Sequence, residues 1–343
     1  MILGICGSGQ LSMGLCLAAK ELKIKTIVLS DDKDGPSKNL CDEYIYFNLN
    51  EKDKIKSFSE KIDVATMEFE KFDFNTLKMI EQYKPVYPKP EINLLVSSRK
   101  KEKDFFNALG IPTTDYISIS NKDDIMQNKN LIPGLLKGDF GYDGLSTYEV
   151  NSLDDVEKLD IKFDKNFILE KKVNLKKEIS VIATRYINGQ INIFEPFENV
   201  HKKKILRETK VPAEISSNII KKAKIYTKNI LEKHNYIGTM AVEFFINDQN
   251  NLLVNESASR PHNSGWITVN ASNSSQFSQH VRACCDLEFV PLKKMKKGNM
   301  INIIGDEIIE YRKKIFNSRE FFFDYKKKEI RPGRKMGHLN TIE

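Results

Sequence analysis

Short apolar runs alternate with amphipathic segments through residues 1–90. Ile2–Cys6 is an apolar run that ends at a glycine turn, and the apolar residues of Leu11–Leu22 recur at helical spacing. Lys25–Leu29 is predicted as a second strand, and Asp63–Thr66 as a later one that leads to Glu68. Strands that alternate with helices in this way predict a βαβ unit and a parallel sheet.

The rest of the chain has strand patterns that pair through polar turns. Ile132–Leu136 and Thr147–Val150 flank a glycine-containing loop, which predicts a hairpin lid. Glu178–Ala183 and Ile191–Phe194 predict a strand pair that turns at Asn188-Gly189. Further predicted elements are a helix at 103–109 that stops at Gly110, a strand at Phe167–Glu170, a helix at Ser216–Lys233, and a strand at Phe321–Tyr325 that leads into a basic loop.

A chain of 343 residues is long enough for two or three domains. Prolines at 85, 88 and 90 interrupt the first pattern, so the first domain is predicted to close there. We predict a mixed α/β and α+β architecture with four parts: a doubly wound domain at 1–95, a linker and lid at 96–175, a central domain at 176–310, and a C-terminal strand with a basic loop at 311–343.

Composition and charge exclude several classes of protein. Hydrophobic residues make up 40% of the chain, but no apolar run reaches the roughly 18 residues of a membrane span. The N-terminus lacks the pattern of a secretion signal, and the five cysteines have no CxxC pair, which indicates reduced thiols in the cytoplasm. The net charge of +7 comes largely from lysine runs without interleaved aromatic residues, which are typical of solvated faces rather than of nucleic-acid binding.

The glycine turn after the first strand has two interpretations. Gly4, Gly7 and Gly9 partly match a dinucleotide-binding fingerprint, but Ser12 stands where its third glycine belongs. A helix N-terminus at such a turn favours an anion, although a tight turn without a ligand explains the glycines equally well. Asp31, near the end of the second strand, keeps a nicotinamide dehydrogenase open as an alternative.

Two glutamates flank a predicted hairpin later in the chain. If Gln249 and Asn250 centre its turn, Glu243 and Glu256 stand directly opposite each other on the ladder. Their Cβ atoms would then be about 4.5 to 5.5 Å apart, and the two carboxylates would repel unless a cation relieved them. Oxygen ligands, with Asn255 beside them, favour Mg²⁺ that also binds phosphate oxygens. Two solvent-exposed glutamates on a twisted edge are the alternative, but the strand around the first glutamate is strongly apolar.

A charged and polar run, RPHNSG at residues 260–265, follows this hairpin directly. A buried core would not accept such a run without partners, so the loop is typical of ligand binding. Short motifs of this kind follow one another across nearly the whole chain: Gly7-Ser8-Gly9-Gln10-Leu11, Glu68-Phe69-Glu70, Arg99 with Glu102-Lys103, Gly141-Tyr142-Asp143-Gly144, Glu178-Ile179-Ser180-Val181, Asn199 with His201, Arg260 to Gly265, Ser275-Gln276-Phe277, and Arg331 to His338. In this order they resemble the 5-(carboxyamino)imidazole ribonucleotide synthase family of purine biosynthesis.

The resemblance implies an ATP-grasp fold, in which an N-terminal doubly wound (Rossmann-like) domain precedes a lid and a central domain that clamp ATP. It also implies a homodimer and a carbon–nitrogen ligase that uses ATP and Mg²⁺. In the implied reaction, ATP phosphorylates bicarbonate to carboxyphosphate. The exocyclic amine of aminoimidazole ribonucleotide then captures the carboxyl group, and ADP and phosphate are left.

The resemblance also implies a role for each matching residue. Residues expected to bind ATP are Arg99 and Lys137 at the phosphates, Glu170 and Val173 at the adenine, Glu178 at the ribose, and Asn255 beside the magnesium ligands Glu243 and Glu256. Residues expected to bind the ribonucleotide are Gln10, Leu11, Glu68, Lys328, Arg334 and Lys335, with Lys328 and Arg334 at its 5′-phosphate. Tyr142, Asp143, Arg260, His262 and Asn263 would surround the bicarbonate and the amine.

The chain departs from the family pattern at several positions. Leu145, Ser146 and Thr147 follow GYDG where a basic residue, a glycine and a glutamine are usual, Ser98 replaces an acidic residue, and Ser259 replaces a proline. These departures leave two further alternatives. One is a related ATP-grasp carboxylate–amine ligase with another acceptor, and the other is a nucleotide-binding protein with a defective lid.

Overall fold

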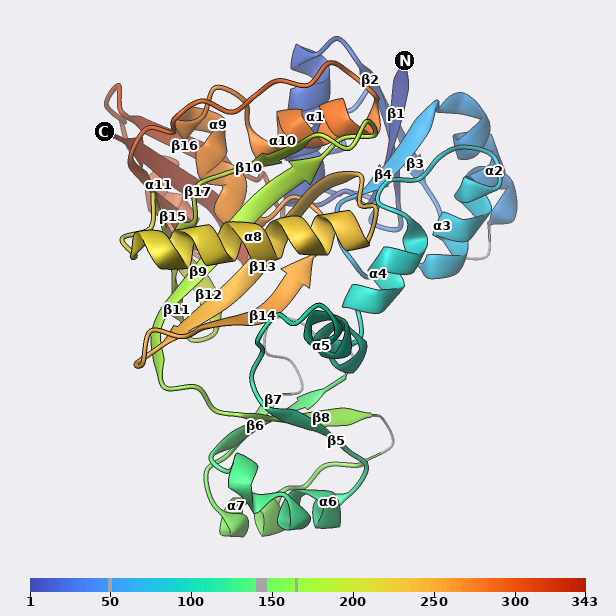
Figure 1. Cartoon of the computed structure of the whole chain (residues 1–343). Helices are drawn as coiled ribbons and strands as arrows, with labels where there is room; N and C mark the ends of the chain where they lie inside the picture. Colours follow the sequence, from blue (N-terminus) through green and yellow to red (C-terminus); the bar gives the residue numbers. More distant parts are fainter. Residues whose placement is uncertain (49–50, 140–146, 164–165) are drawn as a thin grey trace.

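The computed structural model describes residues 1–48, 51–139, 147–163 and 166–343 (Figure 1). Over these residues the strands form three sheets. In Figure 1 the small sheet of the lid lies at the bottom, well apart from the N-terminal sheet at the upper right, and the large sheet lies beside both. No helix within the described ranges is long and apolar enough to cross a membrane, and all five cysteines are free.

Four parallel strands form the N-terminal sheet in the order β3-β2-β1-β4. Alternate residues point to opposite faces, so Leu3 and Val28 pack with α1, whereas Leu29 packs with α2 and α3. Helices on both faces make this the predicted doubly wound sheet. The elements are β1 (Ile2–Cys6), α1 (Gln10–Glu21), β2 (Lys25–Ser30), β3 (Glu43–Tyr46), α2 (Lys52–Lys61), β4 (Val64–Met67) and α3 (Phe74–Glu81).

The lid is an antiparallel sheet in the order β5-β8-β6-β7. The predicted pairing of β6 with β7 is confirmed, with Lys137 opposite Thr147. Helix α5 connects the first domain to the lid and begins at Arg99, four residues earlier than predicted. The elements are α4 (Pro90–Val96), α5 (Arg99–Ala108), β5 (Tyr116–Ile119), α6 (Lys122–Gln127), η1 (Lys129–Leu131), β6 (Gly134–Gly138), β7 (Thr147–Val150), α7 (Leu153–Lys158) and β8 (Phe167–Lys171).

The large sheet runs in the order β14-β13-β9-β11-β12-β15-β17-β16, with β10 paired to β9. Ile179, Val181 and Phe244 pack beneath α8, so Glu178 and Ser180 point to the other face of the sheet. The elements are β9 (Leu175–Arg185), β10 (Ile191–Ile193), β11 (Phe197–Lys202), β12 (Ile205–Val211), α8 (Ser217–Lys233), β13 (Gly238–Asn247), β14 (Leu252–Ala258), η2 (Asn263–Ile267), α9 (Thr268–Ala271), α10 (Gln276–Cys284), β15 (Gly298–Ile304), α11 (Glu307–Tyr311), β16 (Glu320–Asp324) and β17 (Lys335–Ile342).

The C-terminal segment differs from the sequence prediction. RPGRKMGH was predicted as a basic loop, but β17 begins at Lys335 and lies between β15 and β16. His338 and Asn340 are buried in this strand, so polar residues occupy positions where an apolar alternation would have marked it. As a result, the strands after residue 311 belong to the same sheet as β9 and β13.

Candidate active site

Glu243 and Glu256 lie opposite each other on the β13–β14 ladder, as predicted, and we call them the carboxylate pair. The surrounding protein and the Glu243 carboxylate raise the pKa of Glu256, even though 48% of its side chain is exposed. Burial would also raise the pKa of Glu243, but a hydrogen bond with His262 outweighs burial and lowers it. Arg99 Nη1 lies 3.4 Å from Glu256 Oε2. The pair therefore concentrates negative charge at one end of the site.

The register of the pair depends on a β-bulge that the sequence analysis did not predict. The innermost rungs of the hairpin, such as Ile246 opposite Leu252, centre on Gln249 alone, so the predicted turn position was wrong by half a residue. A register shift follows, and Asn255 is the extra residue on β14. Without that residue the two glutamates would not be opposite each other.

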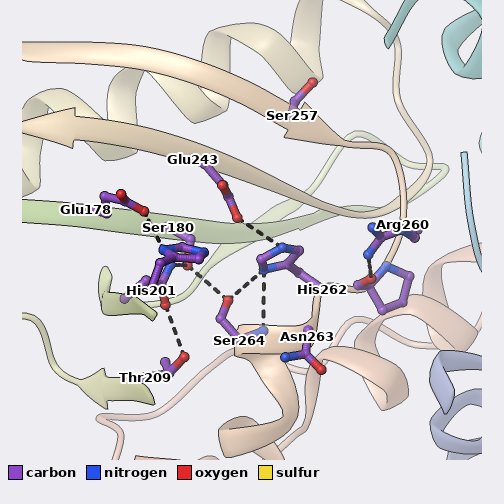
Figure 2. A network of polar contacts seen from close by, with 12 residues as sticks. Glu178, Ser180, His201, Thr209, Glu243, Ser257, Arg260, His262, Asn263 and Ser264 are labelled. Carbon is purple, nitrogen blue, oxygen red and sulfur yellow. Dashed lines mark hydrogen bonds and ion pairs between the residues drawn. The ribbon is translucent and has the colours of Figure 1, made fainter. Parts of the chain in front are cut away.

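A chain of hydrogen bonds orients His262 toward the carboxylate pair (Figure 2). Asn199 Nδ2 donates to Ser180 Oγ over 2.9 Å, so the Ser180 hydroxyl is available to donate to Ser264 Oγ over 3.0 Å. The Ser264 hydroxyl can then donate to His262 Nδ1 over 2.8 Å. His262 Nε2 therefore carries the proton and faces Glu243 Oε1 at 3.0 Å.

Glu178 and His201 form a second carboxylate–imidazole contact on the same face of the sheet (Figure 2). Glu178 Oε2 lies 2.5 Å from His201 Nδ1. Burial would lower the pKa of His201, but Glu178 outweighs burial and raises it, and Glu243 acts in the same direction. The sequence analysis quoted His201 in a motif but assigned it no role, because its partner comes from a strand that is distant in the sequence.

Two lysines compensate the buried carboxylate of Glu170. Lys137 Nζ lies 2.9 Å and Lys103 Nζ 3.6 Å from Glu170 Oε2. Burial would raise the pKa of Glu170, but the two lysines lower it to about 2. This side chain is only 3% exposed, so its carboxylate is closed to solvent. Val173 lies half-buried in the segment between β8 and β9.

The N-terminus of α1 is occupied by a carboxylate of the chain itself. Glu68 accepts hydrogen bonds from the backbone N–H groups of Gly9 and Ser12. A Cβ atom on Gly9 would lie 2.6 Å from Glu68 Oε1, so the glycine is needed to admit the carboxylate. The glycine turn therefore serves Glu68 rather than a dinucleotide phosphate. Leu11, the second residue of α1, is buried in the core.

Gln10 connects three parts of the chain. Its Nε2 donates to Asn263 Oδ1 over 2.8 Å, and its Oε1 accepts from Lys327 Nζ over 2.9 Å. Asn263 in turn donates to Asn302 Oδ1 over 3.1 Å. The first helix, the RPHNSG loop and the C-terminal loop therefore meet at one side chain.

Lys327, Arg334 and Lys335 form what we call the basic cluster. Lys327 Nζ donates to the carbonyl oxygen of Lys335 over 2.7 Å. Burial, Arg334 and Lys335 together lower the pKa of Lys327 to about 8. Lys328, which the sequence analysis selected, is 74% exposed at its side chain and pairs with Asp34 at 2.9 Å. Three consecutive lysines carry no pattern that would have selected Lys327.

The remaining predicted residues are placed as follows. Arg260 Nε lies 2.9 Å from Glu70 Oε1, which joins the RPHNSG loop to the segment after β4. Tyr142 and Asp143 lie outside the described residues. Glu102, which was assigned no role, accepts hydrogen bonds from the backbone and hydroxyl of Ser257, directly beside the carboxylate pair. Burial raises the pKa of Glu102 to about 8.

Comparisons with known proteins match this arrangement over the whole chain. Residues 1–96 match the ribonucleotide synthetase preATP-grasp domain, residues 104–277 the ATP-grasp domain, and residues 299–343 the phosphoribosylaminoimidazole carboxylase C-terminal domain. The N5-carboxyaminoimidazole ribonucleotide synthase of Bacillus subtilis (strain 168) is 33% identical over 348 residues, which cover 100% of this chain and 91% of that protein. The chain belongs to the N5-carboxyaminoimidazole ribonucleotide synthase family.

Solved structures of this synthase family share the fold. An ADP complex of an N5-carboxyaminoimidazole ribonucleotide synthetase has a TM-score of 0.94 and 32% identity, and the match covers 100% of this chain and 92% of that one. A synthase from Aspergillus clavatus, in complex with ADP and 5-aminoimidazole ribonucleotide, has a TM-score of 0.91 and 25% identity, with 100% and 93% covered. The predicted ATP-grasp fold is confirmed, and the dehydrogenase alternative is wrong.

Two departures from the family pattern have structural partners in this chain. Ser259 donates its hydroxyl hydrogen to Asn93 Oδ1 over 2.5 Å, which ties β14 to α4. Ser98 donates to the carboxylate of Asp139 at the end of β6. Thr147 opens β7, while Leu145 and Ser146 lie outside the described residues.

Proposed function

We infer that this chain carboxylates 5-aminoimidazole ribonucleotide with bicarbonate in de novo purine biosynthesis. The products of this ATP-dependent ligase are 5-(carboxyamino)imidazole ribonucleotide, ADP and phosphate. One observation carries the inference: a carboxylate pair and a basic cluster stand at two ends of one site that Gln10 and Asn263 connect. The relatives solved with ADP, and with ADP and the ribonucleotide, support the same substrates.

ATP is proposed to lie between the lid and the large sheet. Arg99 and Lys137 approach the carboxylate pair from α5 and β6, and both lower the pKa of Glu256 against the effects that raise it. Two cations in that position suit the phosphates, because charge-assisted hydrogen bonds to phosphate oxygens are strong. Glu178, held by His201, would take the ribose hydroxyls, and the backbone at 170–173 would take the adenine.

Magnesium fits the carboxylate pair by the chemistry of its donors. Within the described residues no group of three or more His, Cys, Asp or Glu side chains could hold a metal ion, so the protein offers Glu243 and Glu256, with Asn255 beside them. Mg²⁺ is commonly held by one or two carboxylates together with phosphate oxygens and water. When bound, the ion would neutralise charge on the transferring phosphoryl group.

The basic cluster would hold the 5′-phosphate of the ribonucleotide. Lys327 and Arg334 supply a point charge and a planar donor fork, and both suit phosphate oxygens. Glu68 and Gln10 lie beside the cluster at the start of α1 and would seat the sugar. Lys328 would remain with Asp34 and outside the contact.

The chemistry proceeds in two displacements. A bicarbonate oxygen attacks the γ-phosphorus of ATP, a P–O bond forms, and ADP leaves as the old P–O bond breaks. The exocyclic amine then attacks the carbonyl carbon of carboxyphosphate, the C–O bond to phosphate breaks, and phosphate leaves with the amine proton. Arg260, His262 and Asn263, with Tyr142 and Asp143, are proposed to surround the reacting atoms, where positioned donors stabilise developing negative charge.

The cellular setting and the oligomeric state are separate proposals. Five free cysteines suit a reducing compartment, so we propose a cytoplasmic enzyme. The homodimer implied by the family resemblance is retained as a proposal, and sedimentation of the purified chain would test it.

The function is tested by a coupled assay of ADP release. With Mg²⁺, ATP, bicarbonate and 5-aminoimidazole ribonucleotide present, the expected rate is high, and omission of the ribonucleotide should remove most of it. Incorporation of isotopically labelled bicarbonate into the ribonucleotide should match ADP release one to one. A rate of ADP release that does not depend on the ribonucleotide, or that requires another amine, would contradict the assignment and favour a related ligase.

A further inference from the structure

The first turn of α5 is bound to the end of β6 through one buried residue. Asp139 is 5% exposed and directly follows β6, which carries Lys137 two residues earlier. Its carboxylate oxygens lie 3.1 and 2.9 Å from the Ser98 hydroxyl, and its Oδ1 accepts from the Lys100 N–H over 2.8 Å. Its backbone carbonyl accepts from the Arg99 N–H over 3.0 Å. One residue therefore receives three donors from a single helix start.

These contacts satisfy the free N–H groups at the start of α5. A helix leaves its first four N–H groups without intrahelical partners. Here Asp139 takes those of Arg99 and Lys100, and Ser98 Oγ takes that of Lys101 over 3.3 Å. A carboxylate at this end of a helix is also favoured by the helix dipole. The first turn of α5 is therefore ordered by a residue of the lid rather than by a ligand.

The Arg99 side chain is held by the same strand end. Its Nε donates to the carbonyl oxygen of Gly138 over 3.2 Å, and its Nη1 lies 3.4 Å from Glu256. The backbone N–H of Asp139 donates to the carbonyl oxygen of Asn166, the residue just before β8, over 2.7 Å. The positions of Arg99 and Lys137 are thus fixed relative to each other, and the contacts of Asp139 with the start of α5 hold them so.

We propose that Asp139 is a positioning residue that holds Arg99 and Lys137 in one arrangement for the phosphates of ATP. The proposal rests on the proposed function, in which these two cations contact the phosphates. Asp139 itself does not touch the nucleotide in this account. Its contribution comes from preorganisation, since a cation that is already in place loses less freedom when its ligand arrives.

The direction of the change in nucleotide affinity distinguishes a positioning role of Asp139 from a purely electrostatic one. A carboxylate near the phosphates repels them, so removal of its charge alone would strengthen nucleotide binding. If Asp139 acts by positioning Arg99, Asp139→Asn weakens binding instead, because a neutral amide with one acceptor oxygen replaces a charged carboxylate with two, so its hydrogen bonds with Ser98 and Lys100 are weaker. We expect the dissociation constant of a non-hydrolysable ATP analogue with Mg²⁺ to rise about five- to ten-fold, measured by calorimetric titration.

A matched control distinguishes positioning from helix stability. Asp73 also binds the start of a helix, as the N-cap residue of α3, and accepts from the N–H and hydroxyl of Thr76 over 2.7 Å each. Asp73→Ala, which removes this cap, should lower the unfolding temperature but leave the dissociation constant unchanged. Ser98→Thr, which keeps the hydroxyl, should bind the analogue as wild type does, whereas Ser98→Ala should bind it less tightly.

A double-mutant cycle gives the decisive test. If Asp139 acts through Arg99, then Asp139→Asn should have little further effect on analogue binding in an Arg99→Ala background. Additive effects of the two substitutions, or unchanged or tighter binding in Asp139→Asn alone, would overturn the proposal. The titration contains no ribonucleotide and needs no turnover, so its failure is distinct from a failure of the carboxylation assay.

Discussion

The two ends of the proposed site hold surplus charge of opposite sign. At the ATP end, the carboxylate pair brings two negative charges together, and its surroundings raise the pKa of Glu256. At the ribonucleotide end, the basic cluster brings positive charges together, and burial with Arg334 lowers the pKa of Lys327 to about 8. Each end is costly in the free protein and becomes favourable when a ligand of opposite charge arrives.

Glu170 differs from these two ends, because lysines of the chain itself pair with its carboxylate. It is more deeply buried than Glu256, yet Lys137 and Lys103 lower its pKa to about 2. Its charge is compensated within the chain, whereas the charges of Glu256 and Lys327 are driven toward their neutral forms. At Glu256 and Lys327 the move toward the neutral form coincides with a ligand that the proposed function supplies, whereas the move of Glu170 toward its charged form is caused by lysines of the chain itself.

The largest effect is expected from Glu256→Gln. The substitution removes half of the carboxylate pair, so turnover should fall at least about a hundred-fold. Stability should not fall. Since the folded-state pKa of Glu256 is raised above its unfolded value, its ionised form destabilises the protein at pH 7, and the neutral amide removes that cost. ADP release and urea unfolding at pH 7 measure the two quantities.

A control for this substitution lies elsewhere on the same sheet. Glu198 of β11 pairs with Lys177 at 2.7 Å, away from the site. Glu198→Gln should leave turnover unchanged and lower stability slightly, which is the reverse pattern. Wild-type turnover of Glu256→Gln with an unchanged requirement for Mg²⁺ would remove the metal from the carboxylate pair.

A smaller effect, confined to the other end, is expected from Arg334→Ala. A charge-assisted contact with a phosphate is worth about 1.5 to 3 kcal/mol, so the Michaelis constant for the ribonucleotide should rise about ten-fold or more. The constant for ATP should hardly change. Arg331, an exposed neighbour that pairs with Glu329, provides the control, and Arg331→Ala should change neither constant. Equal weakening of both substrates in Arg334→Ala would indicate general damage instead of a phosphate contact.

Several features of the fold and of the site could be predicted from the sequence, because the residues that determine them lie close together along the chain. Glu243 and Glu256 flank a short hairpin, so the opposition of their side chains followed from counting along two strands. Strands β1 and β2 of the doubly wound sheet also followed, because Ile2–Cys6 and the Ile27–Leu29 part of β2 are apolar, whereas β3 was not predicted. The family resemblance supplied the order of the domains.

What the sequence did not give depended on contacts between distant segments. The turn is centred half a residue before the predicted position, and the bulge at Asn255 compensates this difference. No pattern in the sequence NNLLVNE marks either feature. Lys327 could not be told from Lys328, because the choice depends on Gln10, which is 317 positions away. Likewise β17 was missed, since its buried positions include His338 and Asn340, and their partners, the Tyr325 hydroxyl and the Trp266 carbonyl oxygen, are brought to them only by the fold.

The smallest effect is a dependence of ribonucleotide binding on pH, and it tests the positive end of the comparison directly. Because the pKa of Lys327 is lowered to about 8, the free enzyme loses this positive charge as the pH rises from 7.5 to 9, well before an ordinary lysine would. The bound phosphate favours the charged form, so the Michaelis constant for the ribonucleotide should rise several-fold over that range, while the constant for ATP stays flat. Lys327→Met should have a raised constant at pH 7.5 and no further rise up to pH 9. Lys328→Met removes an equal charge from an exposed pair with Asp34 and should retain the wild-type profile. If Lys328→Met abolished the rise and Lys327→Met retained it, the phosphate contact would belong to the lysine that the sequence first indicated.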